Sequence, residues 1–447
     1  MRLNIEKLVY GGEGLARLPS DEQGPGKAVF VPFVLPGETV EAVLREEKPG
    51  FARAQLEGIL TPSARRIAPR CPYFPRCGGC HYQHTDYEYQ LEIKSAILKE
   101  NLRRIAKLEL GTELRIHPSP PWNYRNRSRF KIRLSPEFAI GYYRFNSHEL
   151  LPVEECPISS PLINRALAAM WQLGRGGKVP AGIQEIEFFA NGDDTQLLSE
   201  VYCSPEAAKV AEAFATELKS SVTELSGLAF FAARSSKTEG QGEPRRISDT
   251  GITHLMYTTQ LASYRVSAGA FFQVNRYLTD ELVNIVVPGR RGGRDAHRTA
   301  GGDAGATGTA LDLYAGVGLF SSVLNREFER VIAVESSHTS HTDLLYNSPA
   351  NVKAVRATAE QYLENAAGKL RTELVVVDPP RSGLGESVIK GLVKLQAPRL
   401  TYVSCDPATL SRDLARLLQA GYRVEEAHLV DLFPQTYHLE SVFHLVR

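Results

Sequence analysis

The segment TALDLYAGVGLF, residues 309–320, contains an apolar strand with an acidic residue near its end, followed by a turn with two glycines. Gly316 and Gly318 allow a tight turn and let a ligand approach the backbone. Six further apolar runs follow, and helical segments such as ESVIKGLVKLQ (386–396) and TLSRDLARLLQAG (409–421) lie between them. Buried strands that alternate with helices predict a doubly wound, mainly parallel sheet, the α/β architecture of Rossmann-like folds.

Acidic residues stand near the carboxyl ends of three of these strands: Asp312, Glu335 and Asp378. Open α/β sheets bind ligands at this edge, and an acid there can hold ribose hydroxyls. The chain has neither a complete GxGxxG signature nor a GxxxxGK[ST] phosphate loop. An adenosyl ligand without a pyrophosphate is therefore expected, although Asp312 and Glu335 could each simply cap a following helix.

The first sixty residues favour a small β-barrel. Alternation in AVFVPFVL (28–35) and TVEAVL (39–44), with recurrent turn signals, predicts short strands. Residues 61–134 then contain 15 Lys and Arg but only 6 Asp and Glu, in a chain whose net charge is +1. This local excess predicts a polyanion-binding surface, with a merely solvated basic surface as the alternative.

A basic strand is expected within this stretch. In WNYRNRSRFKIRLS (122–135), cationic residues recur at every second position, namely Arg125, Arg127, Arg129, Lys131 and Arg133. Side chains at this spacing project from one face of a strand, so they predict an RNA-facing surface. Some of them could instead pair with acids inside the protein.

Six cysteines in 447 residues are too few for a disulfide scaffold, so we expect a reducing, cytoplasmic setting and roles in metal binding or catalysis. Cys71, Cys77 and Cys80 lie in one loop, and Cys156 lies far downstream. Four thiolates can hold a [4Fe–4S] cluster or a tetrahedral zinc ion. The spacing matches neither a zinc ribbon nor the C-x3-C-x2-C motif of radical enzymes, which argues against radical chemistry.

The length of 447 residues suggests about three domains. We expect the barrel at 1–62, a central α+β domain with the Cys-rich loop and basic strand at 63–265, and the catalytic domain at 266–447. Two polar, Gly-rich segments, 235–251 and 288–308, predict loops or disorder, and we interpret 288–308 as a flexible insert. No apolar run approaches the about 18 residues of a membrane helix, and no secretory signal is evident. A monomer without membrane contact is expected.

Several motifs together resemble the RNA 5-methyluridine methyltransferase family, namely DLYAGVGLF (312–320), DPPR (378–381), SCDPATLSRD (404–413) and FPQTYHLE (433–440). The segment GGEGLAR (11–17) is similar to a TRAM domain, an OB-like RNA-binding barrel. With the Cys-rich loop, the chain is most similar to the TRAM-containing, iron–sulfur-containing branch that methylates uracil C5 in 23S ribosomal RNA. The resemblance covers nearly the whole chain apart from the two inserts. It implies a class I methyltransferase domain that uses S-adenosylmethionine (SAM).

The resemblance also implies site residues. It assigns SAM contacts to Gln273 in AFFQVN, Tyr314, Gly316, Gly318, Glu335 and Asp378. It implies a [4Fe–4S] cluster, rather than zinc, on Cys71, Cys77, Cys80 and Cys156. Two positions depart from the family pattern, because Leu319 and Thr358 stand where relatives often carry Asn.

Cys405 and Glu440 are expected to carry the chemistry. Cys405 follows the fifth predicted strand at the ligand-binding edge, where a thiol is a candidate nucleophile. Addition of its thiolate to C6 of uracil turns C5 into an enolate-like carbon that can accept a methyl group. In the family, a glutamate of the FPQTYHLE-type motif then removes the C5 proton, which implies Glu440 as the base. A free thiol has a pKa of about 8.5, so Cys405 needs activation.

Three functions remain open: methylation of uridine C5 in structured RNA with 23S rRNA favoured, the same reaction on tRNA, and non-catalytic RNA binding by an iron–sulfur protein. The barrel and the four cysteines favour rRNA, because the common bacterial tRNA enzymes of the family lack both. The presence of Cys405 and Glu440 favours catalysis. Methylation of an amino group is not expected, since Arg381 rather than an aromatic residue follows the Pro-Pro pair.

Overall fold

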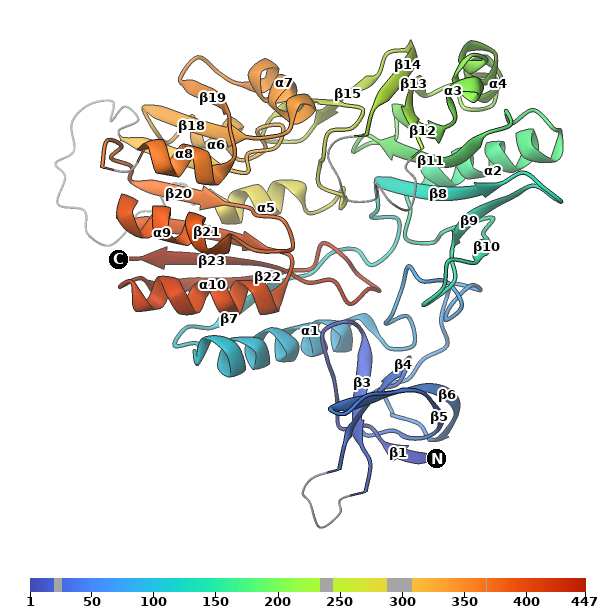
Figure 1. Cartoon of the computed structure of the whole chain (residues 1–447), viewed down its shortest axis with the longest axis horizontal. Coiled ribbons are helices and arrows are strands. Elements are labelled where there is room, and N and C mark those ends of the chain that lie inside the picture. The colour runs from blue at the N-terminus through green and yellow to red at the C-terminus, as the bar shows by residue number, and fades with distance from the viewer. Residues whose placement is uncertain (20–25, 234–243, 288–307, 367) are drawn as a thin grey trace.

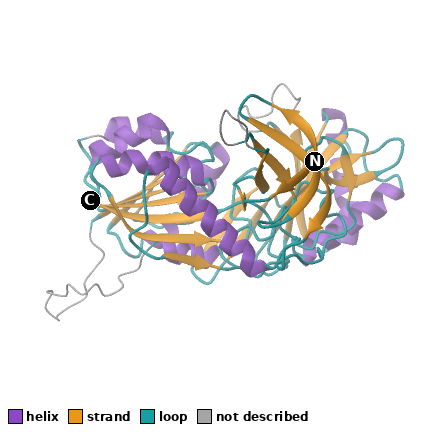
Figure 2. Ribbon diagram, turned by 90° about the horizontal axis from the view of Figure 1, so that it is seen from below, coloured by secondary structure: helices purple, strands orange, loops and turns teal. Residues whose placement is uncertain are grey.

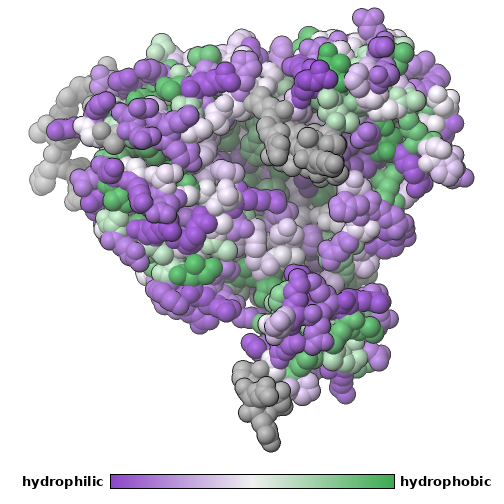
Figure 3. Space-filling model, viewed as in Figure 1, coloured by the Kyte–Doolittle hydropathy of each residue, from purple (hydrophilic) through white to green (hydrophobic). Residues whose placement is uncertain are grey.

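The computed structural model describes residues 1–19, 26–233, 244–287, 308–366 and 368–447. These residues form sheets of six, seven, two and eight strands (Figure 1). Hydrophilic side chains cover much of the face seen in Figure 1, as Figure 3 shows. None of the helices in these ranges is both long enough and apolar enough to cross a membrane.

The N-terminal sheet is a barrel, as predicted. Its strands are β1 (Arg2–Asn4), β2 (Lys7–Leu8), β3 (Glu13–Arg17), β4 (Ala28–Pro32), β5 (Thr39–Glu47) and β6 (Phe51–Thr61). The strand order is β1-β5-β6-β4-β3-β2. β1 and β2 are the two edge strands of this order, and only two residues separate them in the chain. They form one bent segment, which brings the two edges together and closes the sheet into a barrel. Alternate residues such as Val29, Val31 and Val40 fill its interior.

The central sheet has the order β10-β9-β8-β11-β12-β13-β14. Its strands are β8 (Arg127–Arg133), β9 (Ala139–Tyr143), β10 (Leu150–Pro152), β11 (Ile183–Ala190), β12 (Leu197–Cys203), β13 (Leu225–Ala232) and β14 (Arg246–Gly251). The helices α2 (Pro161–Arg175), α3 (Pro205–Ala208) and α4 (Ala211–Ser221) share its hydrophobic core. The hairpin of β15 (His254–Thr258) and β16 (Ser263–Ser267) follows.

The prediction of a loop over 235–251 is wrong for its last six residues, which form β14. β14 is polar, but its backbone pairs with the apolar strand β13, and this pairing does not require apolar side chains. The rest of the prediction falls largely on 234–243, and the insert predicted at 288–308 falls on 288–307. Both of these segments lie outside the described residues.

The catalytic sheet has the order β19-β18-β17-β20-β21-β23-β22-β7. Its strands are β7 (Leu114–His117), β17 (Thr309–Leu313), β18 (Arg330–Glu335), β19 (Val352–Arg356), β20 (Leu374–Val377), β21 (Arg399–Ser404), β22 (Arg423–Val430) and β23 (Glu440–Val446). All pairs are parallel except those that β23 makes with β21 and β22. The seven strands predicted after residue 308 are confirmed. The eighth, β7, comes from the range that the sequence assigns to the central domain.

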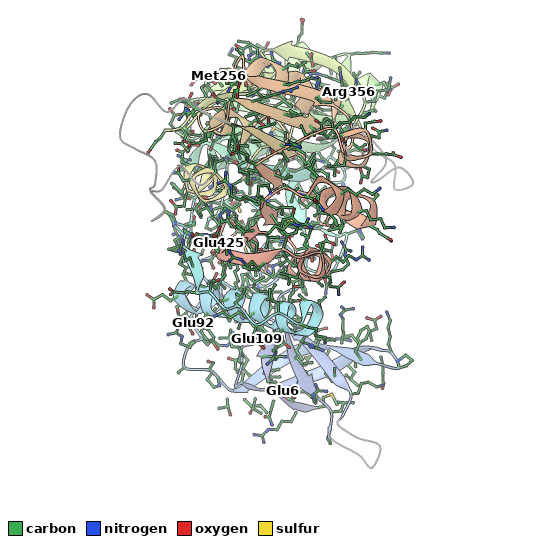
Figure 4. All side chains as sticks on the ribbon, turned by 90° about the vertical axis from the view of Figure 1, so that its left-hand side faces the viewer. Glu6, Glu92, Glu109, Met256, Arg356 and Glu425 are labelled. Carbon is green, nitrogen blue, oxygen red and sulfur yellow. The ribbon has the colours of Figure 1, made fainter. Side chains whose placement is uncertain are left out.

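Helices cover both faces of this sheet, as the doubly wound prediction requires (Figure 2). One face packs against α5 (Thr279–Val286), α6 (Ser321–Leu324) and α7 (His338–Asn347). The other packs against α8 (Ala359–Ala366), α9 (Gly385–Leu395), α10 (Pro407–Gln419) and the end of α1 (Tyr87–Asn101), which continues as a π-helix over Leu102–Ala106. Figure 4, where Glu6 and Glu92 are labelled, shows α1 between the barrel and the catalytic sheet.

Candidate active site

Two neighbouring strands bring Cys405 and Glu440 together. β21 ends at Ser404, β23 begins at Glu440, and Ser404 pairs with Ser441 in antiparallel register. Cys405 and Glu440 are the next residues beyond this last pair, and Glu440 is close enough to raise the pKa of Cys405. The Cys405 side chain is half-buried and that of Glu440 is buried. The predicted nucleophile and base are therefore neighbours at the expected edge of the sheet.

Burial and nearby acids favour the protonated forms of both groups. Burial raises the pKa of Cys405 to about 12, with further contributions from Glu440 and Asp378. Burial also raises the pKa of Glu440 well above its usual value, and Asp378 adds to the effect. Arg381 opposes both shifts, so its charge favours the thiolate and the carboxylate. The sequence identifies Arg381 only as a residue that is not aromatic, and this second role depends on the charges around it.

Asp312 lies near the end of β17, and Asp378 directly follows the adjacent strand β20. Burial raises the pKa of Asp378 to about 7, and Asp312 adds to this shift. Burial likewise raises the pKa of Asp312 to about 7, against the hydrogen bond that the Ser321 hydroxyl donates to it. The other carboxylate oxygen of Asp312, Oδ1, is buried without a hydrogen-bond partner among the described residues.

The glycine-rich turn has the backbone of a ligand-binding turn. Tyr314, Gly316 and Gly318 have φ angles of 63°, 57° and 94°, in the left-handed region. A Cβ added at Gly316 would meet no atom within 4 Å, so a ligand has room there. Glu335 accepts hydrogen bonds from the backbone N–H groups of Gly316 (2.9 Å) and Ser337 (2.6 Å). Its carboxylate therefore holds the turn against the start of α7.

The remaining SAM-related positions differ in what they offer. Gln273 is buried, and its side-chain amide makes no hydrogen bond to any described residue. Leu319 is buried in the core beneath the turn. Thr358 instead begins α8, because its hydroxyl accepts the N–H of Gln361 at 3.3 Å and the Gln361 side chain accepts the N–H of Thr358 at 3.1 Å.

Helix α1 holds the loop that leads to Glu440. The Lys94 ammonium lies 2.6 Å from the Asp431 carboxylate and donates to the backbone carbonyl of Phe433 at 2.9 Å. Gln90 and Gln435 form a reciprocal pair, in which Gln90 Nε2 donates to Gln435 Oε1 at 3.0 Å and the Gln435 N–H donates to Gln90 Oε1 at 2.9 Å. These buried bonds fix the course of the loop.

The Cys-rich loop contacts the same segment. The backbone N–H groups of His81 and Tyr82 donate to the carbonyl oxygen of Gln435 at 2.8 and 3.0 Å. Both residues follow Cys80 directly. The loop that carries three of the predicted metal-binding cysteines is thus bonded to the segment that leads to the predicted base.

The four predicted metal-binding cysteines line one cavity of about 260 Å³, together with residues such as Gln83 and Arg125. Their thiols influence one another, because Cys156 contributes to the raised pKa values of Cys71, Cys77 and Cys80. Burial is the main cause of these shifts and raises the pKa of Cys77 to about 12. Among the described residues, no three His, Cys, Asp or Glu side chains are grouped as a single metal ion requires.

Several cations of the basic strand form ion pairs within the protein, so fewer of them are available to bind RNA than their spacing suggests. β8 shows the predicted alternation, but the neighbouring strand β11 opposes acids to its cations. The alternative of internal ion pairs therefore holds for Arg127 and Arg129 with Glu187, and for Lys131 with Glu185. Arg125 faces the cysteine cavity. Arg133 is exposed and has no acidic partner among the residues that the structure describes.

Known proteins resemble this chain along nearly its whole length. The family described as tRNA (Uracil-5-)-methyltransferase matches residues 86–447, and the TRAM domain matches residues 1–56. A relative from Aquifex aeolicus (strain VF5), called an uncharacterized RNA methyltransferase, is 34% identical over 99% of this chain and 97% of its own length. The 23S rRNA (uracil(1939)-C(5))-methyltransferase RlmD of Paraburkholderia xenovorans (strain LB400) is 29% identical over 98% of this chain and 92% of its own.

A solved structure shares the fold. The crystal structure of Pyrococcus abyssi tRNA (uracil-54, C5)-methyltransferase in complex with S-adenosyl-L-homocysteine superimposes with a TM-score of 0.73 at 23% identity, and the match covers 100% of both chains. Together with the family match over most of the sequence, this shows that the catalytic sheet is a SAM-dependent methyltransferase domain. The chain therefore belongs to the RNA (uracil-5-)-methyltransferase family, as a SAM-dependent enzyme with an N-terminal TRAM domain.

Proposed function

We propose that this enzyme methylates C5 of a uridine in 23S rRNA through a covalent bond between Cys405 and C6 of the base. The observation that carries the proposal is the closeness of Cys405 and Glu440, which lie just beyond the last pair of β21 with β23, Ser404 with Ser441, and are near enough for Glu440 to raise the pKa of Cys405. The choice of rRNA over tRNA is supported by the P. xenovorans relative, whose name states that substrate and whose similarity spans nearly this whole chain.

Each step of the reaction has a residue of this chain in place. Cys405 Sγ gives its proton to water and adds to C6, the electrons of the C5=C6 double bond move to C5 and its carbonyl as an enolate, and the charge of Arg381 favours the thiolate that this step needs. SAM, when bound, supplies the methyl group that C5 receives. Glu440 then takes the C5 proton, the electrons of that C–H bond restore the C5=C6 double bond, and Cys405 leaves as a thiolate. The raised pKa of Glu440 makes its ionised form a stronger base than an exposed glutamate.

We propose that SAM is held by the residues named from the sequence, namely Gln273, Tyr314, Gly316, Gly318, Glu335 and Asp378. Three observations support this placement. The backbone at Gly316 faces open space, the Gln273 amide makes no bond to the described residues, and Asp312 and Asp378 lie at the ends of the adjacent strands β17 and β20. Leu319 and Thr358 have structural roles and offer no amide group to the cofactor.

We further propose that Cys71, Cys77, Cys80 and Cys156 hold a [4Fe–4S] cluster. A single zinc ion with Zn–S bonds of about 2.3 Å would draw its four sulfurs to about 3.8 Å from one another. The four thiols instead line a cavity of about 260 Å³. A larger cluster suits that space better. Its role is structural or RNA-facing rather than redox, because the methyl transfer moves no net electrons.

The proposed function is tested by release of tritium from uracil C5. Protein purified without oxygen is incubated with SAM and unmodified 23S rRNA or tRNA carrying tritium at C5, and tritium in water is counted. We expect release from 23S rRNA that requires SAM, none with Cys405→Ala, and normal release with Cys203→Ala, whose thiol is buried away from the site. Release only from tRNA would overturn the rRNA assignment, and release by Cys405→Ala would overturn the covalent mechanism.

A further inference from the structure

A tyrosine of the barrel reaches the loop that carries the nucleophile. Tyr10 lies just after β2, and its hydroxyl donates to the backbone carbonyl oxygen of Cys405 at 3.0 Å. The two residues are 395 positions apart in the chain. The TRAM domain therefore touches the active site directly.

The same tyrosine also contacts the loop that leads to Glu440. The Tyr10 ring meets the edge of the Tyr437 ring, with centroids 5.4 Å apart. Tyr10 and Tyr437 pack together against a hydrophobic cluster that joins the barrel to α1 through Leu8, Leu35, Tyr82, Ile93 and Ile97. Because this cluster supports the ring, the hydroxyl is held in place beside Cys405.

The hydrogen bond from Tyr10 is made to a carbonyl group that has no partner strand. The pairing of β21 with β23 ends at Ser404, so the carbonyl of Cys405 lies beyond the last ladder bond. Among the described residues, Tyr10 is the donor that this oxygen has. Burial, Asp406 and Cys405 raise the pKa of Tyr10 well above its usual value, so the hydroxyl keeps its proton and remains a donor.

We propose that Tyr10 is a positioning residue that orients Cys405 for attack on C6, so that the barrel completes the active site. The inference rests on the proposed role of Cys405 as the nucleophile. The Tyr10 hydroxyl holds the backbone of Cys405 in place. The Tyr10 ring holds Tyr437, in the segment that leads to Glu440. If either contact is lost, the Cys405 thiol can turn away from the orientation needed to attack C6. No group that takes part in the reaction is removed.

The test compares Tyr10→Phe with Tyr89→Phe in the full-length protein. Tyr89 belongs to the same side-chain cluster, but its hydroxyl makes no hydrogen bond to a described residue. We expect Tyr10→Phe to lower kcat by about five- to tenfold, the factor that one hydrogen bond supplies, with KM for SAM and RNA and the melting temperature unchanged. Tyr89→Phe should keep kcat within about twofold of the original enzyme.

Equal kcat values for the two variants would overturn the inference. So would a fall in kcat for Tyr10→Phe that is matched by a lower melting temperature, because that result indicates a purely structural contact. Cys405→Ala is measured in parallel. If it still releases tritium, the proposed function fails. If it is inactive while Tyr10→Phe behaves like Tyr89→Phe, only the positioning role fails.

Discussion

The ammonium group of Lys94 lies 2.6 Å from the carboxylate of Asp431, and neither side chain has any exposed surface. Asp431 also lies beside the Tyr87 hydroxyl, whose pKa it raises, and Lys94 is the cation that pairs with this buried carboxylate. Breaking a buried ion pair by removing one partner is strongly destabilising, because the remaining charge is left without a counter-charge. This ion pair therefore stabilises the contact between α1 and the loop that leads to Glu440.

Replacing Lys94 with Met should lower the free energy of unfolding by about 3–5 kcal/mol, because Asp431 would remain buried and unpaired. Urea denaturation followed by circular dichroism measures the change. Lys390→Met is the matched control, since Lys390 and its partner Glu386 are 69% and 66% exposed. It should cost less than about 1 kcal/mol. Equal losses in the two variants would contradict the importance of the buried pair.

Glu440→Gln should allow addition of Cys405 to the base and methyl transfer but block removal of the C5 proton. A covalent protein–RNA adduct should then accumulate and appear as a slow band on a denaturing gel. Glu425→Gln changes an exposed glutamate on β22, labelled in Figure 4, and should form no adduct. If Glu440→Gln turns over normally without an adduct, another group is the base.

Alkylation of Cys405 by iodoacetamide should be slow at neutral pH, because its pKa of about 12 leaves very little thiolate. The rate should rise about tenfold for each pH unit and show no plateau below about pH 10, since only the thiolate reacts. Arg381→Ala should slow the reaction further, because the arginine lowers the pKa of this thiol. Mass spectrometry of the labelled peptide follows the rate, and a plateau near neutral pH would disprove the high pKa.

Asp312→Asn should change how stability depends on pH. The folded pKa of Asp312 is about 7, above its usual value of 3.8, so the folded protein retains a proton that the unfolded chain loses. The free energy of unfolding should therefore fall as pH rises between about 4 and 7, by up to about 1.4 kcal/mol per unit from this group. The Asn variant should lack this contribution. Urea denaturation of both proteins across that window measures the difference, and parallel curves would refute it.

Arg133→Ala should weaken RNA binding and reduce the slope of log K against log salt by about 1, because this exposed arginine has no acidic partner among the described residues. Lys131→Ala should change the slope less, since Glu185 already neutralises that lysine. Filter binding at several salt concentrations distinguishes the two. Equal slopes for both variants would mean that the ion pairs open when RNA binds.

Local patterns predicted most of the catalytic sheet, because strands such as TALDL and LVVV are apolar along their length and lie between amphipathic helices. β14 was missed because its side chains are polar and its stability comes from backbone pairing with β13. For a related reason, the sequence could not decide whether the cations of β8 face RNA or pair with acids of the protein. Glu185 and Glu187 lie some 55 residues after the basic strand, and only the register of β8 with β11 places them opposite Lys131 and Arg129.

Motifs and strand order predict the candidate site residues. Both kinds of signal identify residues that lie at the same edge of one sheet. Contacts that join different sheets leave no such pattern. Neither the bond from Tyr10 to Cys405 nor the pair of Lys94 with Asp431 can be found from spacing, since 395 and 337 positions separate the partners. Arg381 was visible in the DPPR motif, and its role follows only from the charges that surround it.

The strand β7 pairs in parallel with β22, and Arg115 of β7 meets Glu426 of β22 across 311 positions of sequence. A ribosome adds about 5–20 residues per second, so β7 is made roughly 15–60 s before its partner exists. β7 can therefore take its place beside β22 only after nearly the whole chain has been made, although it is itself made early.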